Sequence, residues 1–488
     1  MPTPKNTKSK PDLRNRAYAL DALRGAAILM MIFSGIIPFG RLPSWMYHAQ
    51  VPPPSHVWNG NLPGITWVDL VFPFFLFSMG AAIPLALAKR VEQGTQWWKL
   101  VYQILIRGAL LGGFAVYIRH VRPYTMNAHP DKTTWLLSLL GFALLFPVFV
   151  RLPDTWDRLS KFMVKVIGWI GAVALLLYVS FPGKSLLAIR YPDLHRMAQQ
   201  NDIIIILLAN MAVFGSLIWL VTRENLLLRL GFMGVMMAIR LSTPVHGWVG
   251  VLGAKSPIPW LYQLGYLQYL HIVIPGTIVG DIVLRWLRRP DAESEKRNWP
   301  ALRLVGTVLL MLSIAVVMII GLKERWLWQT TVAGFVMCGL GWLLMRNPVT
   351  STEKLLKDLF AWGTYWLLLG LIFEPHGGGI KKDSATMSYY FVSSGLAIFL
   401  LIGFTIVIDI LRKRRWLWLL IDNGQNPMVA YAGAGNPIHP ILALTGLGAV
   451  IEAHTHGPWP GVARGALITL LIALSVSLFT RLKVYWRT

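Results

Sequence analysis

The sequence predicts an all-α fold, a polytopic integral membrane bundle of about 12 to 14 transmembrane helices, and three observations support this prediction. The 488 residues are 55% hydrophobic and only 14% charged, whereas soluble domains carry about 25% charged residues. Apolar stretches of about 20 residues, long enough for a helix to cross a bilayer, recur along the chain. The formal net charge is +24, with basic residues gathered between the apolar stretches. The positive-inside rule explains this charge, so nucleic acid is not an expected partner.

Fourteen segments are candidate spans. The segment 227–247 is weak because it contains Arg240, and 427–449 is weak because it is rich in Gly, Asn and Pro. A bundle without these two segments is also acceptable. The candidates are 17–39, 67–88, 99–118, 134–150, 162–181, 202–221, 227–247, 264–287, 302–321, 326–345, 356–373, 388–411, 427–449 and 463–482.

The basic residues also predict an orientation. Residues 1–16 are basic and lack a small-residue cleavage site after a short apolar core, which indicates a cytoplasmic tail rather than a removed signal peptide. With alternating spans, the basic run 412–415 and both termini fall on the cytoplasmic side. Residues 17–488 then form a single transmembrane domain, and the histidine-containing loop 40–66 lies outside the cytoplasm.

A histidine and a carboxylate stand where a polar loop gives way to an apolar segment. The stretch SHVWNGNLPGITWVDLVFPFFLF carries His56 near its start and Asp69 about one turn inside the span 67–88. A carboxylate there is costly without a partner. His56 is a candidate partner because a carboxylate can orient an imidazole and raise its basicity. The alternative is a simple loop histidine and a carboxylate that caps the helix start.

Other polar residues in or beside the spans favour a cavity within the bundle. Asp21 and Arg24 are three residues apart on one helix face, which suits an ion pair, a snorkelling anchor or an anion site. The segment PGTIVG at 275–280 should let another helix or a ligand approach closely. Each polar residue alone would most often be a contact between helices, but several in one bundle favour a cavity. The others are Gln268, His271, Asp281, Asn426, Asn436 and His439.

Two classes of function fit such a cavity. A transporter would bind a solute at midplane polar groups and broken helices. A membrane acyltransferase would place a base near an acyl donor and connect that donor to an acceptor. The sequence shows no glycine-rich phosphate loop, G-x-S-x-G motif or H-E-x-x-H motif, and no metal site is expected from its single cysteine, Cys338.

Several motifs together resemble the transmembrane acetyltransferase family of heparan-alpha-glucosaminide N-acetyltransferase. LDALRG, then His56 with WNG, then TWVDLVFPFFLFSMG, match that family's D-x-x-R-G span, its loop with H-x-x-W-N-G and its D-L-V-F-P-W-F-x-F-x-M-G span. Segments 380–397 and 424–433 and the stretch RLKVYW also resemble family segments, whereas roughly 150–260 and 290–350 do not match. Within the family the chain looks most like the bacterial DUF5009-like branch, which carries the longer MYHAQVPPPSH loop.

The resemblance implies an integral membrane enzyme that moves an acetyl group from cytosolic acetyl-CoA to an amino sugar or glycan on the far side. His56, just before WNG, carries over as the active histidine, and Asp69 as the carboxylate that orients it. His48, which the longer loop adds, is the competing imidazole. The histidine would act as general base or accept the acetyl group itself. The remaining alternative is a multi-span transporter of a small or sugar-like solute.

Binding residues follow from the resemblance and from ligand chemistry. The phosphates of acetyl-CoA favour arginine and lysine, and aromatic and amide groups suit a sugar, although the same groups also fit an interfacial belt. Asn59 or Asn426 is a candidate donor to the oxyanion. The acetyl-CoA candidates are Arg24, Asn426 and His271, and the acceptor candidates are Trp58, Asn59, His48 and Lys382.

The implied partners are the lipid bilayer, a carbohydrate acceptor and, as the family suggests, a second copy in a homodimer. The implied location is the bacterial inner membrane, with the loop 40–66 in the periplasm. The identity of the acceptor, N- or O-acetylation, and direct transfer or an acetyl-histidine intermediate are left open.

Overall fold

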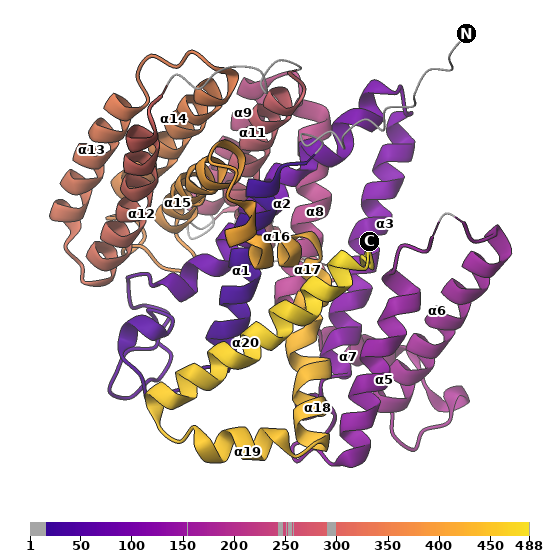
Figure 1. Cartoon of the computed structure of the whole chain (residues 1–488). Helices are drawn as coiled ribbons and strands as arrows, with labels where there is room; N and C mark the ends of the chain where they lie inside the picture. The colour runs from indigo at the N-terminus through magenta and orange to yellow at the C-terminus, as the bar shows by residue number, and fades with distance from the viewer. Residues whose placement is uncertain are drawn as a thin grey trace, which may run out of the picture.

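The computed structural model describes residues 16–153, 155–242, 247–249, 251, 256, 258–289 and 299–487. Within these ranges the chain is helical, apart from turns and one isolated β-bridge between Val150 and Trp486 (Figure 1). Twelve of the described helices are long and apolar enough to cross a membrane, or thirteen if one bent pair counts as a span. The predicted all-α polytopic bundle is therefore confirmed. The helices are α1 (Tyr18–Ile36), α2 (Trp67–Glu92), α3 (Trp97–His120), α4 (Pro123–Met126), α5 (Lys132–Phe149), α6 (Arg158–Ser180), α7 (Tyr191–Gln199), α8 (Ile203–Thr222), α9 (Leu226–Ser242), α11 (Leu270–Leu287), α12 (Ala301–Lys323), α13 (Leu327–Leu344), α14 (Ser351–Ile372), α15 (Met387–Thr405), α16 (Trp418–Gln425), α17 (Pro427–Gly433), α18 (His439–Leu444), α19 (Leu447–His454) and α20 (Pro458–Arg481).

One predicted span is described only in part, and another is broken. The segment 227–247 is observed as α9, a helix of 17 residues, and residues 243–246 lie outside the described part. The segment 427–449 is broken, because the helical stretch Pro427–Leu444 meets α19 at an angle of 90°. The break falls at Gly446, whose φ of +72° ends a right-handed helix. Of the predicted basic tail 1–16, only Arg16 lies within the described residues.

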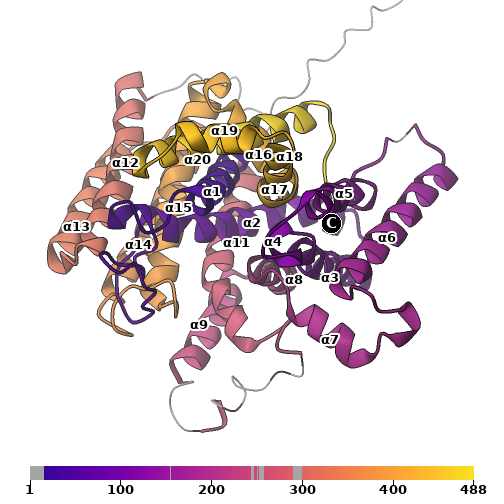
Figure 2. The same cartoon turned by 90° about the horizontal axis from the view of Figure 1, so that it is seen from below.

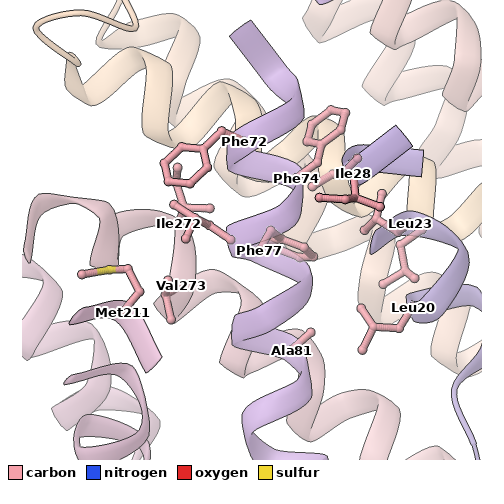
Figure 3. Close-up of a cluster of buried hydrophobic side chains, with 14 of the residues drawn as sticks. Leu20, Leu23, Ile28, Phe72, Phe74, Phe77, Ala81, Met211, Ile272 and Val273 are labelled. Carbon is pink, nitrogen blue, oxygen red and sulfur yellow. The ribbon is translucent and has the colours of Figure 1, made fainter. Parts of the chain in front are cut away.

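Helix α2 lies at the centre of the bundle, between α1 and α11 (Figure 3). Its apolar side chains are buried on both sides, which explains why its sequence is an almost unbroken apolar run. The cluster drawn in Figure 3 contains Leu20, Leu23 and Ile28 of α1, Phe72, Phe74, Phe77 and Ala81 of α2, Met211 of α8, and Ile272 and Val273 of α11.

Glycines let α2 and α11 touch backbone to backbone. A Cβ atom at Gly276 would overlap the carbonyl oxygen of Phe77, and one at Gly80 would overlap that of Val273. Small residues at such contacts are typical of membrane helices that pack closely. The segment PGTIVG is expected to let another helix approach closely, and in the structure that helix is α2.

The bundle has two ends, which we name the basic face and the loop face. The basic face is where α1 begins, with the guanidinium of Arg414 4.3 Å above the ring of Tyr18. The loop face is where α1 ends and residues 37–66 lead into α2. The loop 373–386, between α14 and α15, joins the same face, because the Gly64 N–H donates to the Ile380 carbonyl oxygen at 2.7 Å.

Helices α6 and α7 lie at one edge of the bundle, away from α12 and α13 (Figure 2). Nearly all residues of α6 are exposed or half-buried, with only Gly168, Ala172 and Leu175 buried. In a bilayer this exposed apolar surface would face lipid.

Candidate functional site

Three predicted residues meet at the loop face, where α2 begins. Nδ1 of His48 lies 2.6 Å from Oδ1 of Asp69. Nζ of Lys382 lies 3.2 Å from each ring nitrogen of His48. The His48 side chain is 37% exposed, whereas Asp69 is fully buried. The arrangement is a solvent-accessible imidazole whose Nδ1 contacts a buried carboxylate.

The Asp69 carboxylate is satisfied by local backbone as well as by His48. Its Oδ2 accepts from the N–H groups of Thr66 at 2.9 Å and Ala49 at 3.1 Å. Thr66 and Asp69 form a capping box at the start of α2, so the helix-cap interpretation is confirmed. These bonds offset the cost of burying the carboxylate and fix its direction.

The lysine reaches this group from a distant part of the sequence. Lys382 belongs to the loop 373–386, whose Lys381 N–H donates to Oγ1 of Thr386 at 3.1 Å. The Tyr389 hydroxyl, one turn into α15, donates to the carbonyl oxygen of Asp69 at 2.8 Å. The two loops and the first turns of α2 and α15 therefore hold the three side chains together.

The predicted contact between His56 and Asp69 is wrong, because the histidine that contacts Asp69 is His48. The described contacts of the Asp69 carboxylate include His48 and not His56. The His56 ring instead packs edge-on against Tyr47, with ring centroids 5.1 Å apart, and its backbone φ is +49°. Three prolines lengthen the loop between His48 and His56, and the chain folds back so that the earlier histidine reaches the carboxylate.

The two predicted acceptor residues in the same loop lie apart from the imidazole. Trp58 is 61% exposed. The Asn59 side chain accepts from the Asn61 N–H at 3.0 Å, which makes a local turn of the loop. Within the described residues, neither side chain forms a hydrogen bond with His48, Asp69 or Lys382.

A cavity of about 590 Å³ lies within the bundle beside α2. Near the basic face its described lining carries five arginines and no acidic residue. Apolar residues line most of the rest, and Tyr431 closes the far end, where its hydroxyl donates to Asp202 at the start of α8. The five arginines are Arg24, Arg90, Arg107, Arg151 and Arg487.

Arg24, the predicted acetyl-CoA residue, lines this cavity. Its guanidinium donates to the Ser78 carbonyl oxygen at 3.0 Å and lies 3.7 Å from the Asp21 carboxylate. The predicted placement of Asp21 and Arg24 on one helix face is observed as this contact. Asp21 also pairs with Arg16 at 2.6 Å, so it neutralises only part of the nearby positive charge.

Arg487 lies in the segment that follows α20 and reaches the cavity from the side. Burial lowers the pKa of Arg487, and the nearby charges of Arg16 and Arg151 lower it further. Arg107 makes no ion pair with any described acidic residue. Like charges gathered in a partly dry cavity are costly, so the site suits a ligand that carries several negative charges.

Asn426 and His271 do not line this cavity. The Asn426 side chain is buried and holds the segment after α20, donating to the Val484 carbonyl oxygen at 2.8 Å and accepting from the Trp486 N–H at 3.2 Å. His271 is buried, with Nδ1 2.7 Å from the Gln268 carbonyl oxygen and its ring stacked on Tyr390. Asn426 thus has protein partners, whereas Nε2 of His271 is buried without a hydrogen bond to a described residue. The acetyl-CoA role of each residue stays a prediction.

The cavity approaches the imidazole group along α2. Phe75, one of its lining residues, is six residues beyond Asp69 in the same helix. Six residues rise about 9 Å along a helix axis. The cavity therefore connects the arginines to within about two turns of the Asp69 carboxylate. Within the described residues, no group of three or more His, Cys, Asp or Glu side chains could hold a metal ion.

Comparison with known proteins gives a distant relation over a short part of the chain. Over 98 residues the chain is 34% identical to "Heparan-alpha-glucosaminide N-acetyltransferase" of Mus musculus, which covers 20% of this chain and 13% of that protein. Over 97 residues it is 33% identical to the protein of the same name of Homo sapiens, covering 20% of this chain and 12% of that protein. The chain thus spans about an eighth of the length of these curated relatives.

A family described as "Domain of unknown function (DUF5009)" matches residues 16–283. The match includes α1, α2 and α3, the loop with His48 and Asp69, and four of the five cavity arginines. Since it covers more than half of the sequence, the chain belongs to the DUF5009 family.

Proposed function

We propose that the protein is a membrane acetyltransferase that uses acetyl-CoA and acetylates an amino sugar or glycan. The observation that carries the proposal is the His48 imidazole held 2.6 Å from the buried Asp69, about two helix turns along α2 from a cavity rich in arginine. The names of the two curated relatives support the acetyl transfer and the sugar acceptor.

His48 replaces His56 as the proposed reacting imidazole. Because the Asp69 carboxylate accepts, Nδ1 of His48 carries the proton and Nε2 offers a lone pair. His56 lacks such a partner, and its Nδ1 is buried without a hydrogen bond to a described residue. Asp69 is a positioning residue that fixes the tautomer and stabilises the imidazolium when it forms.

The arginine-lined cavity is the proposed site of acetyl-CoA. Its five arginines suit the phosphates, and its apolar walls beyond them suit a long uncharged arm. The arginines lie near the basic face, which corresponds to the cytoplasm if the basic residues follow the positive-inside rule. A ligand bound there with its thioester near Phe75 would point its reactive end toward the imidazole.

In the proposed transfer, side chains of this chain move the proton and stabilise the developing charge. As the acceptor nitrogen or oxygen attacks the thioester carbonyl carbon, its proton passes to Nε2 of His48, and the carbon–sulfur bond breaks as the new bond closes. His48 returns the proton to the leaving thiolate. Lys382, 3.2 Å from the ring, is suited to stabilise the oxyanion or to attract an anionic acceptor. Every group in this proposal comes from one chain, so it does not depend on the homodimer that the family resemblance suggests.

The test compares two histidine variants in proteoliposomes that contain the full chain. Release of CoA from acetyl-CoA is measured with glucosamine as the acceptor probe. We expect His48→Ala to lower turnover about 10²- to 10⁴-fold, the usual contribution of a general base. The matched control His56→Ala should change turnover by less than about threefold, because His56 makes only loop contacts.

Unchanged turnover in His48→Ala would contradict the proposed role. Glucosamine uptake without release of CoA would instead favour the transporter alternative. Retention of labelled acetyl on His48 in a single turnover would replace direct transfer by an acetyl-histidine route.

A further inference from the structure

A polar cavity of about 390 Å³ lies at the loop face, far from the imidazole group, between the ends of α3 and α6 and the helix α7. Its polar lining includes His120 from α3, Lys184 from the turn after α6, and Asp193 and Arg196 from α7. His120 is buried, and its Nδ1 lies 2.9 Å from the Val116 carbonyl oxygen, which leaves Nε2 for another partner.

An apolar groove of about 930 Å³ adjoins this cavity. It follows the outer half of α6, where Ile170, Val173 and Tyr178 are exposed, and it continues to Ile189 beyond the turn. Phe181 and Lys184 line both the polar cavity and the apolar groove. The two hollows are thus adjacent and share these two side chains at the end of α6.

The polar cavity carries more positive than negative charge. Asp193 pairs with Lys184 at 3.1 Å and with Arg196 at 3.6 Å, so one carboxylate faces two cations. The N–H of Arg190 and the Lys184 ammonium hold the pKa of Asp193 below its ordinary value, so it stays ionised. Lys184 is 49% exposed and Arg196 is 75% exposed, which leaves both able to bind a further anion.

The positive-inside rule does not account for these cations. They lie on the loop face, opposite the basic clusters near Arg90 and Arg414. Simple snorkelling would place a lysine beside the membrane, but it would not gather that lysine with a histidine from α3 and an arginine from α7 around one polar hollow.

We propose that this composite hollow binds one phospholipid with an anionic headgroup, from the leaflet at the loop face. The phosphate and headgroup occupy the polar cavity beside Lys184 and Arg196, and an acyl chain lies in the groove along α6. A free phosphate would fill only the polar part, and an uncharged lipid would leave the surplus cations unmatched. The proposal is independent of the acetyltransferase proposal, because it shares no residue with it.

The test uses the purified full chain in detergent and measures bound lipid by native mass spectrometry. Phosphatidylglycerol, phosphatidylcholine with the same acyl chains, and inorganic phosphate are supplied separately. We expect the wild type to retain phosphatidylglycerol about tenfold more than phosphatidylcholine, since each basic residue near a membrane surface contributes to binding an anionic lipid. The double variant K184Q/R196Q should lose this preference, and Ala174→Trp, which fills the groove, should lower retention of both lipids.

Two controls test whether the effect is local. Lys132→Gln removes an exposed cation from the same face, and Leu309→Trp enlarges an exposed apolar residue on α12; both should behave as wild type. Equal retention of the two lipids by the wild type would overturn the proposal. So would full competition by inorganic phosphate together with wild-type retention in Ala174→Trp, because the polar cavity alone would then be the site. A melting temperature within about 2 °C of wild type identifies the folded variants on which the comparison is made.

Discussion

Nδ1 of His48 and the carboxylate of Asp69 lie 2.6 Å apart, and this contact joins the loop 37–66 to α2, one of the most buried helices of the bundle. The same carboxylate closes the capping box with Thr66, so a single side chain both starts α2 and orients the imidazole.

Replacing Asp69 by Asn should separate these two roles. The amide keeps the shape but loses the charge that stabilises the imidazolium, so we expect kcat to fall about 10²-fold or more while KM for acetyl-CoA stays within about threefold. The matched control is Thr66→Val, which removes the capping hydroxyl and should cost about 1 kcal/mol of stability without a comparable fall in kcat. Steady-state kinetics and thermal unfolding of both variants decide between the roles. An equal fall in kcat for the two variants would mean that Asp69 acts only as a helix cap.

Arg487 should contribute to binding of the donor rather than to chemistry. Arg487→Gln removes one of five arginines in the cavity, and we expect KM for acetyl-CoA to rise about tenfold with little change in kcat, since charged hydrogen bonds are worth about 1.5–3 kcal/mol. Lys483→Gln is the control, because it removes an exposed charge from the same segment outside the cavity. The KM values are measured at low and high salt. If both variants change KM equally, the effect comes from general charge and not from the cavity.

The buried ion pair between α9 and α11 should stabilise the fold. Arg229 is 2% exposed and pairs with Asp281 at 2.5 Å, while the Trp219 N–H donates to the other carboxylate oxygen at 3.0 Å. Asp281→Asn leaves the arginine buried without its counter-charge, and we expect a loss of about 3 kcal/mol, at the lower end for a broken buried pair because Asp281 is partly exposed. Thermal unfolding in detergent measures this loss. The double variant R229Q/D281N should lose less than the sum of the two single variants, and strict additivity would show that the pair contributes no coupling.

The contact between α2 and α11 should not tolerate a methyl group. Gly276→Ala places a Cβ atom against the Phe77 carbonyl oxygen, so the helices must separate, and we expect a cost of about 1–3 kcal/mol. Gly339→Ala in α13 is the control, because no atom lies within 4 Å of the added Cβ and alanine favours helix. The midpoint of thermal unfolding should fall for the first variant and stay or rise for the second. Equal midpoints would show that the two helices have room to move apart.

Much of the fold follows from length and apolarity, because a spanning helix must be long, apolar and internally hydrogen-bonded. Those rules find the twelve spanning helices. For 227–247, the described residues form α9, which contains the buried Arg229, and 243–246 lie outside the described part. The rules miss the bend at Gly446, because a hydropathy average does not register one residue with a positive φ.

The sequence predicts part of the contacts at the loop face. Asp69 stands out as a carboxylate within an apolar run, but its partner depends on how the loop folds back, and the motif before WNG favours His56, whereas His48 is the histidine that contacts Asp69. His48 and Lys382, predicted as acceptor residues, lie beside each other in the structure. Of the cavity arginines, the sequence predicts only Arg24 as an acetyl-CoA residue. Their signal was hidden because they come from α1, α2, α3, the end of α5 and the segment after α20, and basic residues near span ends are already expected from topology.

The glycine contact between α2 and α11 also has a mechanical consequence. Because carbonyl oxygens of each helix lie against glycines of the other, α2 and α11 cannot slide past each other by a turn without a clash. The two helices would therefore move as one rigid unit. The carboxylate that opens α2 is fixed to this unit. In the proposed reaction, acetyl-CoA and the acceptor would therefore have to move to a carboxylate that stays in place, and the helices at the periphery of the bundle would have to make the motion that admits them.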